Sequence, residues 1–182
     1  MSILKTNEIQ TTAGKKILGT SGTVIQTTQT VFTSTWSSAG QNGTNFLPVT
    51  GFEASLTPSS NTNKILCMFQ MHLGYGYWEI QGRITRNGTA ISASYGAARG
   101  SRTPASFCAQ NYDGQSSYGY NWITIGYDYL DSPGTTSTCT YGIQLNGYQT
   151  YQLHLNRTGY DYDTADYYGC PASTITLMEV TA

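Results

Sequence analysis

Charged side chains are scarce in this chain of 182 residues: only 10% are Asp, Glu, Lys or Arg, against about 25% in ordinary globular proteins. The formal net charge is −1 and the basic residues are scattered, so we expect no nucleic-acid partner. Solubility must come from neutral polar groups instead, and 15 tyrosines and 20 glycines form the opposite excess. Such a surface suits proteins that recognise sugars or pack against neighbouring subunits.

Long apolar runs are absent as well. No stretch approaches the length that crosses a bilayer, and the N-terminus lacks the hydrophobic region of a signal peptide. We therefore expect no membrane insertion and a chain that stays in the cytosol where it is made, or leaves by a route other than secretion. No long stretch places apolar residues three and four apart either, which excludes amphipathic helices as the main building element.

A two-residue period of apolar side chains replaces the helical one. In residues 63–73 Ile65, Cys67, Phe69 and Met71 alternate with the side chains between them, as expected where successive side chains leave a β-strand on opposite faces. The same alternation predicts strands elsewhere. The expected strands are 23–35, 52–56, 64–73, 78–86, 89–95, 120–130, 138–145, 151–155 and 174–180. The pattern predicts an all-β protein, an antiparallel β-sandwich of the jelly-roll type.

Turn signals separate several of these strands. Asn87-Gly88 predicts a tight hairpin turn, because both residues tolerate the positive φ of type I′. Pro58 and Pro133 should close the strands before them, because proline cannot donate a hydrogen bond to the ladder.

The first residues differ in composition from the rest. Residues 2–18 hold three of the four lysines, lack aromatic residues and can form only two short extended pieces around Ala13-Gly14. A segment so short cannot bury a face of its own and should pair with something else. We divide the chain into an N-terminal segment, residues 1–20, and a β-sandwich domain, residues 21–182.

Two long loops, 96–119 and 156–169, concentrate aromatic residues, and loops on a rigid β scaffold are where recognition is placed. Tyrosine rings offer flat apolar faces with polar edges, which suit sugars. The same tyrosines could instead pack between subunits, and both interpretations stay open. The candidate ligand-binding residues are Tyr112, Asp113, Tyr118, Tyr120, Tyr160, Asp161, Tyr162, Asp163, Tyr167 and Tyr168. Trp36, Trp78 and Trp122 are expected to lie within strands, at core or interface positions.

No motif for catalysis is recognisable. His72 and His154 alternate outward on strands and are expected to be ordinary sheet residues. No Gly-x-Ser-x-Gly sequence occurs, and no cysteine, histidine and acid form a local nucleophilic pattern. Asp161 and Asp163 resemble a glycosidase pair only in their proximity along the chain. We expect no enzymatic activity and no cofactor.

Metal and disulfide interpretations rest on few residues. Asp161, Asp163 and Asp166 could supply oxygen ligands to Ca²⁺, but the spacing lacks the glycine and final glutamate of an EF-hand, so we expect a solvated acidic loop and no metal. Cys67 and Cys139 fall on apolar strand faces, whereas Cys108 and Cys170 lie in loop-like contexts. The absence of C-x-x-C spacing argues against zinc. Four free thiols, or one bridge between the loop cysteines or between subunits, both remain open.

Several fragments resemble one family in the same order along the chain. The fragments are SILKTNEIQTTAGKKIL, TGFEASLTPSSNTNKILCMFQ, ITRNGTAIS, YLDSPGTTSTCTYGIQL and STITLMEV. They resemble virion structural proteins of phages, especially tail-fibre proteins of cyanobacterial phages. The resemblance covers both termini and most strands but not the two aromatic loops.

The resemblance implies a homotrimeric virion component in which the N-terminal segment attaches to a baseplate, fibre or capsid protein. The residues implied in attachment are Ile3, Leu4, Ile9, Ile17 and Leu18. The expected function is a short tail fibre that binds the host cell surface through the aromatic loops, with a surface polysaccharide as the candidate ligand. The alternative is a trimeric capsid cement or head-decoration protein that clamps capsid subunits. A free-standing lectin is the third class, and the resemblance of the termini to virion parts argues against it.

Overall fold

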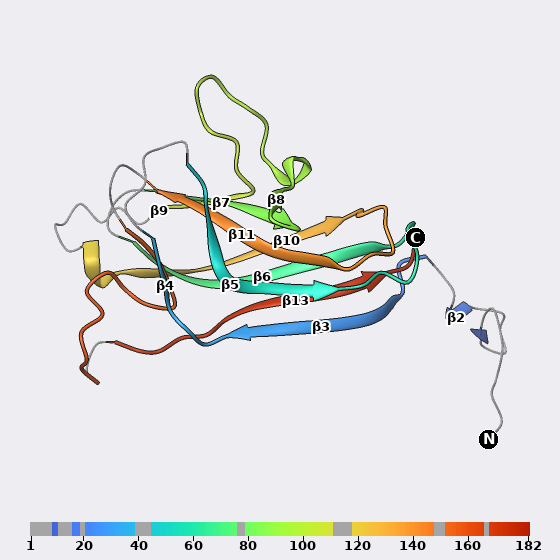
Figure 1. Ribbon diagram of the computed structural model, residues 1–182, viewed down its shortest axis with the longest axis horizontal. Coiled ribbons are helices and arrows are strands. Elements are labelled where there is room, and N and C mark those ends of the chain that lie inside the picture. Colours follow the sequence, from blue (N-terminus) through green and yellow to red (C-terminus); the bar gives the residue numbers. More distant parts are fainter. Residues whose placement is uncertain are drawn as a thin grey trace.

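A computed structural model describes residues 9–10, 16–18, 21–38, 45–75, 79–110, 118–147, 152–165 and 168–182. Two antiparallel sheets pack face to face as a sandwich (Figure 1). The first sheet contains β3 (Val24–Phe32), β4 (Trp36–Ser37), β6 (Lys64–Tyr75), β10 (Trp122–Asp131), β12 (Leu153–Leu155) and β13 (Ser173–Val180). The second contains β5 (Leu47–Leu56), β7 (Glu79–Arg86), β8 (Thr89–Ala90), β9 (Phe107–Gln110) and β11 (Cys139–Gly147). The all-β sandwich expected from the sequence is confirmed.

The strand pairing is that of a jelly roll. Strands from the first half of the domain pair with strands from the second half in reverse order: β3 with β13, β5 with β11, β6 with β10, and β7 with β9. These four antiparallel pairs lie two in each sheet, in the orders β3-β13-β6-β10 and β5-β11-β7-β9. A long hairpin folded over on itself in this way gives two Greek keys.

The long strand β6 organises the first sheet. Its first part pairs with β13 from Lys64 to Gln70, and its end pairs on the same side with the short strand β12 from Leu73 to Tyr75. β4 then pairs with β12. β10 begins and β12 ends beside this end of β6, because Trp122 pairs with Gly74 and Leu155 with Leu73. The segments before β10 and after β12 therefore meet at one end of the sandwich.

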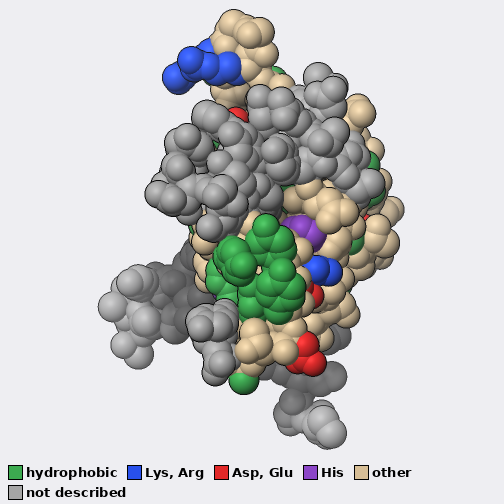
Figure 2. Space-filling model, turned by 90° about the vertical axis from the view of Figure 1, so that its left-hand side faces the viewer, with side chains coloured by type: hydrophobic (Ala, Val, Ile, Leu, Met, Phe, Trp, Pro, Cys, Tyr) green, Lys and Arg blue, Asp and Glu red, His purple; other side chains and the backbone are tan. Residues whose placement is uncertain are grey.

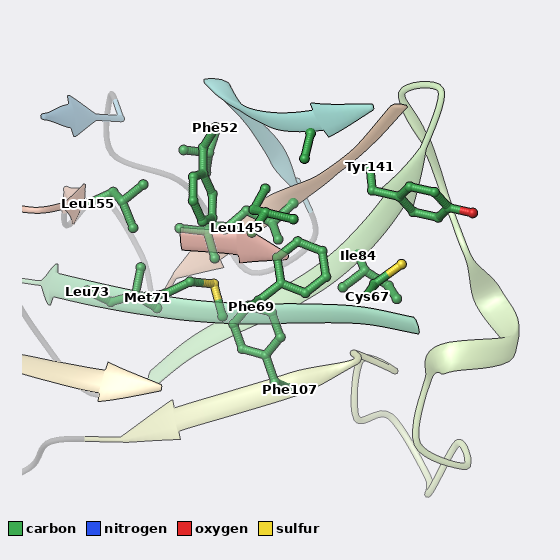
Figure 3. Packing of buried hydrophobic residues seen from close by; sticks show 14 of the residues in the cluster. Phe52, Cys67, Phe69, Met71, Leu73, Ile84, Phe107, Tyr141, Leu145 and Leu155 are labelled. Carbon is green, nitrogen blue, oxygen red and sulfur yellow. The ribbon is translucent and has the colours of Figure 1, made fainter. Parts of the chain in front are cut away.

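The core lies between the sheets and follows the predicted alternation. Ile65, Cys67, Phe69, Met71 and Leu73 of β6 are all buried. They meet inward side chains of the opposite sheet, among them Phe52 and Leu145, as Figure 3 shows. The Phe52 ring lies 5.7 Å from that of Phe32 and 6.5 Å from that of Phe69, so tilted aromatic contacts join three strands.

Two buried acids are held by dedicated partners. Asp131, at the end of β10, accepts hydrogen bonds from the Arg86 guanidinium and from the Tyr141 hydroxyl at 2.7 Å. Glu179 of β13 is fully buried and accepts hydrogen bonds from Asn63, Ser59 and Gln26. Burial alone would raise the pKa of Glu179, but these hydrogen bonds outweigh it and the pKa lies below its ordinary value.

The turn predictions are confirmed. Asn87 and Gly88 have φ of 52° and 76° in the β7–β8 hairpin, as type I′ requires. β5 ends at Leu56 before Pro58, and β10 ends at Asp131 before Pro133.

Other strand boundaries were wrong. The strand predicted over 89–95 stops at Ala90 and continues as the 3-10 turn η1 (Ser92–Ser94). The strand predicted from residue 120 begins at Trp122, because Tyr120 belongs to the 3-10 turn η2 (Tyr118–Tyr120). The predicted loop 96–119 contains β9. β5 begins at Leu47 rather than at residue 52. Pro48 is tolerated there because β5 is an edge strand. Gly51, with a φ of 85°, accommodates the irregular register between β5 and β11.

The N-terminal segment forms two short strands, β1 (Ile9–Gln10) and β2 (Lys16–Leu18), that pair with each other. This confirms the two extended pieces; their partner outside the chain stays a prediction. Ile3 and Leu4 lie outside the described residues, and only the backbone of Ile9, Ile17 and Leu18 is described.

All four cysteines are free thiols, with Cys67 and Cys139 buried and Cys108 and Cys170 exposed. Burial raises the pKa of the Cys67 and Cys139 thiols, so both remain protonated and pack as small apolar groups. In the described part of the chain, no helix is long and apolar enough to span a membrane.

Candidate functional site

The candidate site is built by two segments that meet beyond the end of β6. One is η2, which leads into β10; the other is the segment 156–165, which follows β12. Asn156 holds the second segment in place. Its φ is 59°, its backbone N–H donates to the His72 carbonyl, and its side-chain amide donates to the carbonyls of Phe32 and Ser34. Its side-chain oxygen accepts a hydrogen bond of 2.6 Å from Ser173.

Two glycines let the segments touch. A Cβ atom at Gly159 would lie 3.2 Å from the Gly119 Cα atom, and one at Gly119 would lie 2.4 Å from the Tyr160 ring. The Tyr160 backbone N–H donates to the Gly119 carbonyl at 3.0 Å. The ring of Tyr160 therefore rests directly on the backbone of η2, where any larger residue would displace it.

Four tyrosine rings gather over this contact, and we call Tyr120, Tyr160, Tyr162 and Tyr168 the tyrosine cluster. The Tyr160 and Tyr162 rings are stacked, with centroids 5.6 Å apart and planes 2° from parallel. The Tyr120 ring lies 4.7 Å from that of Tyr160, and the Tyr168 ring contacts those of Tyr120 and Tyr162. Figure 2 shows the end of the sandwich where hydrophobic side chains form a continuous patch at the surface.

The cluster is half-exposed, so its ring faces are open to a ligand. Tyr120 is 51% exposed, Tyr160 45% and Tyr162 56%. The Tyr168 hydroxyl is buried and has no hydrogen-bond partner among the described residues, although buried hydroxyls are normally paired. The exposed faces of Tyr120, Tyr160 and Tyr162 can stack on the C–H face of a sugar, and tyrosine edges can bond to its hydroxyls.

The structure thus brings together four of the predicted site residues. Asp161 and Asp163 are exposed on the same segment. Only the backbone of Tyr118 is described, and Tyr112, Asp113 and Tyr167 lie outside the described residues. Sequence reasoning missed Asn156, Gly119 and Gly159. An Asn at the end of a strand, where a positive φ is tolerated, was the one available signal.

Asp161 forms an ion pair with Arg157 of the same segment. Its carboxylate lies 3.2 Å from the Arg157 Nε atom, and its backbone N–H donates to the Thr158 hydroxyl. The described residues contain no group of three or more metal-ligating side chains; Asp166, the third member of the predicted acidic loop, lies outside them. A partly exposed pair of this kind contributes at most about 1 kcal/mol, so its role is to shape the segment.

The outward histidines differ from the prediction in one case. His154 was expected to lie exposed on its strand, but it is 3% exposed. Gly159 of the following segment lies against its ring, where a Cβ atom would be 3.7 Å from the His154 Nε2 atom. The Nδ1 atom of His154 lies 2.9 Å from the Ser37 hydroxyl. Burial, followed by the charge of Arg157, lowers its pKa to about 4, so the ring under the tyrosine cluster is neutral at pH 7. His72 is partly exposed, as predicted.

The tryptophans flank this region. Trp122 begins β10 and is 37% exposed, with its ring 6.4 Å from that of His72, so it is not a core residue. Trp36 packs against the core from β4, as predicted. Trp78 lies outside the described residues.

The buried His154 predicts a specific acid sensitivity. Its pKa is lower in the folded state than the ordinary 6.5, so the unfolded chain takes up a proton first and stability falls as pH drops from 6.5 toward 4. We expect a loss of about 3 kcal/mol over that window, measured by urea unfolding at stepped pH. His154→Gln should remove this loss. A loss of the same size in the variant would contradict the assignment. The Glu179 carboxylate also contributes stability, because its pKa is lowered in the folded state. That stability is lost only as the pH falls below 4.5, the ordinary pKa of the group, and so outside the His154 window.

Gly119 provides a test of how the tyrosine cluster is held. Gly119→Ala should push the Tyr160 ring off η2, weaken the near-ultraviolet circular dichroism of the tyrosines and cost about 1–3 kcal/mol. Gly96→Ala is the matched control, because a Cβ atom there would meet nothing closer than 4.0 Å. An unchanged tyrosine signal in Gly119→Ala would contradict the contact.

Comparison with known proteins yields no family but remote structural similarities. No family model and no curated protein matches the sequence. Among solved structures, the VP2 subviral particle of infectious bursal disease virus is similar at 11% identity and a TM-score of 0.36, over 86% of this chain. T=1 particles derived from infectious bursal virus are similar at 11% identity and a TM-score of 0.36, over 87%.

This chain spans 37% of the length of each of those two proteins. Both come from virus particles, and neither is described as a tail fibre. At this degree of similarity the comparison carries no conclusion about function, and the resemblance to tail-fibre proteins stays a prediction from the sequence motifs.

Proposed function

We propose that this protein is a virion structural protein, a short homotrimeric tail fibre that binds the host cell surface through the tyrosine cluster. The observation that carries the proposal is the half-exposed cluster of four tyrosines on a preformed backbone contact. Its neutral rings and hydroxyls suit a surface polysaccharide. Weak sites on three copies would add through effective concentration.

The positions of the chain ends and of the tyrosine cluster in the domain support a role as a fibre tip. Gly22 and Thr23, where the sandwich begins, are hydrogen-bonded to Thr181 near its end. Figure 1 places the C-terminus at one end of the long axis and η2, the short yellow helix, at the other. An N-terminal attachment segment and a ligand site at opposite ends are what a fibre tip requires.

The outer face of the first sheet supports a trimer. The outward positions of β3, β6, β10 and β13 carry two charged residues, Lys64 and Asp128. Three apolar side chains are exposed on the same face: Val31 at 54%, Met68 at 36% and Leu130 at 44%. A face so poor in charge is costly to leave in water and suits contact with another copy.

Leu130 allows the trimer to be tested. Leu130→Glu places a charge on this face and should weaken association roughly tenfold per interface. Light scattering after size exclusion should then show mass falling from three times 19.8 kDa toward the monomer upon dilution. Thr136→Glu, at an exposed position in the loop between β10 and β11, should leave the mass unchanged. A monomeric wild-type protein would contradict the trimer.

The cement alternative has an observation of its own. β3 is an edge strand of nine residues, with Val24 and Ile25 each 48% exposed. Exposed edge strands readily accept a strand from another chain, as a clamp between capsid subunits would require.

One experiment separates the two functions. Labelled protein is titrated onto host cells, with an unrelated strain as control, and soluble surface polysaccharide is added as competitor. Saturable, strain-specific and competed binding supports the fibre. A folded trimer that binds no cells, but raises the disassembly temperature of capsids, supports the cement.

A further inference from the structure

A second site lies away from the tyrosine cluster, on the opposite sheet. A pocket of about 480 Å³ opens between the segment 96–105 and the paired strands β7 and β9. Its size falls within the range of small-molecule sites, about 300–1,000 Å³. Arg99, Ser101 and Arg102 line it from the segment, and Glu79 and Gln81 from β7.

The segment that forms the pocket is fixed at its base. The Gly96 backbone N–H donates to the Ala105 carbonyl at 3.0 Å, and the Ser106 N–H donates to the Gly82 carbonyl at 2.8 Å. The Arg83 guanidinium donates two hydrogen bonds to the Pro104 carbonyl. These bonds hold the segment against β7, so a ligand would meet a preformed pocket rather than order a loose loop.

The turn at the tip brings two arginines to one place. The Arg102 backbone N–H donates to the Arg99 carbonyl at 3.3 Å, and Gly100 between them has a φ of 60°. This conformation suits the first central residue of a hairpin turn and favours glycine there. Arg99 and Arg102 thus occupy the two ends of one turn, and both line the pocket.

These arginines differ from the other three in the chain. Arg83 donates to Pro104 and lies over aromatic rings, Arg86 pairs with Asp131, and Arg157 pairs with Asp161. Among the described residues, neither Arg99 nor Arg102 has an acidic partner. In a chain with only nine basic residues, two such guanidinium groups at a single pocket provide a site for a carboxylate.

The opposite wall selects among anions. An ionised Glu79 can only accept hydrogen bonds, so it can accept bonds from sugar hydroxyls, and it repels a doubly charged phosphate more strongly than a single carboxylate. The Cys108 thiol beside it adds no charge, because partial desolvation of this exposed residue and then the Glu79 carboxylate raise its pKa to about 11. The pocket therefore pairs a cationic end with a hydroxyl-accepting end.

We propose that this pocket binds an acidic sugar of the uronic-acid class, with its carboxylate on Arg99 and Arg102 and its hydroxyls on Glu79 and Gln81. The site goes beyond the proposed function, because it lies on other strands and takes a charged rather than a neutral sugar.

The test compares two trisaccharides that differ only in the carboxylates. Calorimetric titration with β-1,4-linked trimannuronate should show saturable binding at least tenfold tighter than with β-1,4-mannotriose. Arg99→Gln and Arg102→Gln should each weaken trimannuronate binding roughly tenfold, as expected for a lost charge-assisted hydrogen bond. Lys64→Gln, which removes an exposed charge on the other sheet, should leave it unchanged.

Two controls keep the result specific. Replacing Tyr160 and Tyr162 with alanine should leave trimannuronate binding unaltered. The binding of acidic sugar at this pocket can therefore be judged separately from the binding of host cells by the tyrosine cluster. Inorganic phosphate at equal concentration should not compete. Equal binding of both trisaccharides, competition by phosphate, or full binding by the folded Arg99→Gln, Arg102→Gln double variant would each overturn the proposal.

Discussion

Replacing Tyr160 and Tyr162 together with alanine is expected to reduce saturable binding to host cells by at least about 100-fold. The stacked pair supplies much of the exposed ring surface of the tyrosine cluster. Aromatic anchors at binding surfaces commonly contribute about 2 kcal/mol each, and loss at every copy also removes avidity. Because both rings are about half in solvent, folding should be little affected. Binding of labelled protein to cells is the measurement.

Two matched variants define what the rings contribute. Tyr160→Phe with Tyr162→Phe keeps the faces and removes the hydroxyls, so an intermediate loss would assign part of the affinity to hydrogen bonds. Val24→Ala removes an exposed apolar side chain elsewhere and should bind as the wild type does. If the double alanine variant binds normally but loses its trimeric mass, the tyrosines are subunit contacts instead.

Arg86→Met is expected to cost about 4 kcal/mol of unfolding free energy. Asp131 has a side chain only 5% exposed, and without Arg86 its carboxylate keeps only the Tyr141 hydroxyl among the described contacts. Breaking a buried ion pair from one side leaves an uncompensated charge in a poorly solvated site. Urea unfolding at pH 7 should show the loss, whereas Arg99→Met, at an exposed position on the second site, should stay within about 0.5 kcal/mol.

The double variant tests whether the effect belongs to the pair. Asp131→Asn in the Arg86→Met background removes the buried charge while retaining an acceptor for Tyr141, and should restore part of the stability. A cost below about 1 kcal/mol for Arg86→Met alone would place the pair with ordinary surface salt bridges.

The alternation of apolar residues was sufficient to predict the sandwich. In β6 the inward residues from Ile65 to Leu73 are those that the two-residue period predicted to be buried, because such a period arises when one face of a strand packs against the core. Asn87-Gly88 specified its hairpin for a local reason, because few residues adopt positive φ.

The errors arose where distant segments decide the outcome. His154 has the sequence context of an outward strand residue, and its ring is buried where Ser37 of β4 and Gly159 of the following segment lie against it. The strand β9 lies in a stretch rich in small and polar residues, and it forms because the edge of β7 offers unpaired hydrogen-bonding groups from Glu79 to Gly82. Similarly, the tyrosine residues could be predicted as a set, but their meeting depends on the Gly119–Gly159 contact between segments forty residues apart in sequence.

The pairing of β3 with β13 determines when this chain can fold. The first strand of the sandwich has its hydrogen-bonding partner at residues 173–180, so it must wait on the ribosome until those residues have been synthesised. Contacts of such sequence separation make folding slow and leave β3, with its exposed valines, unpaired in the interval. Chains that terminate early would be aggregation-prone rather than partly active, and any tag added after Ala182 would emerge beside Gly22 and Thr23.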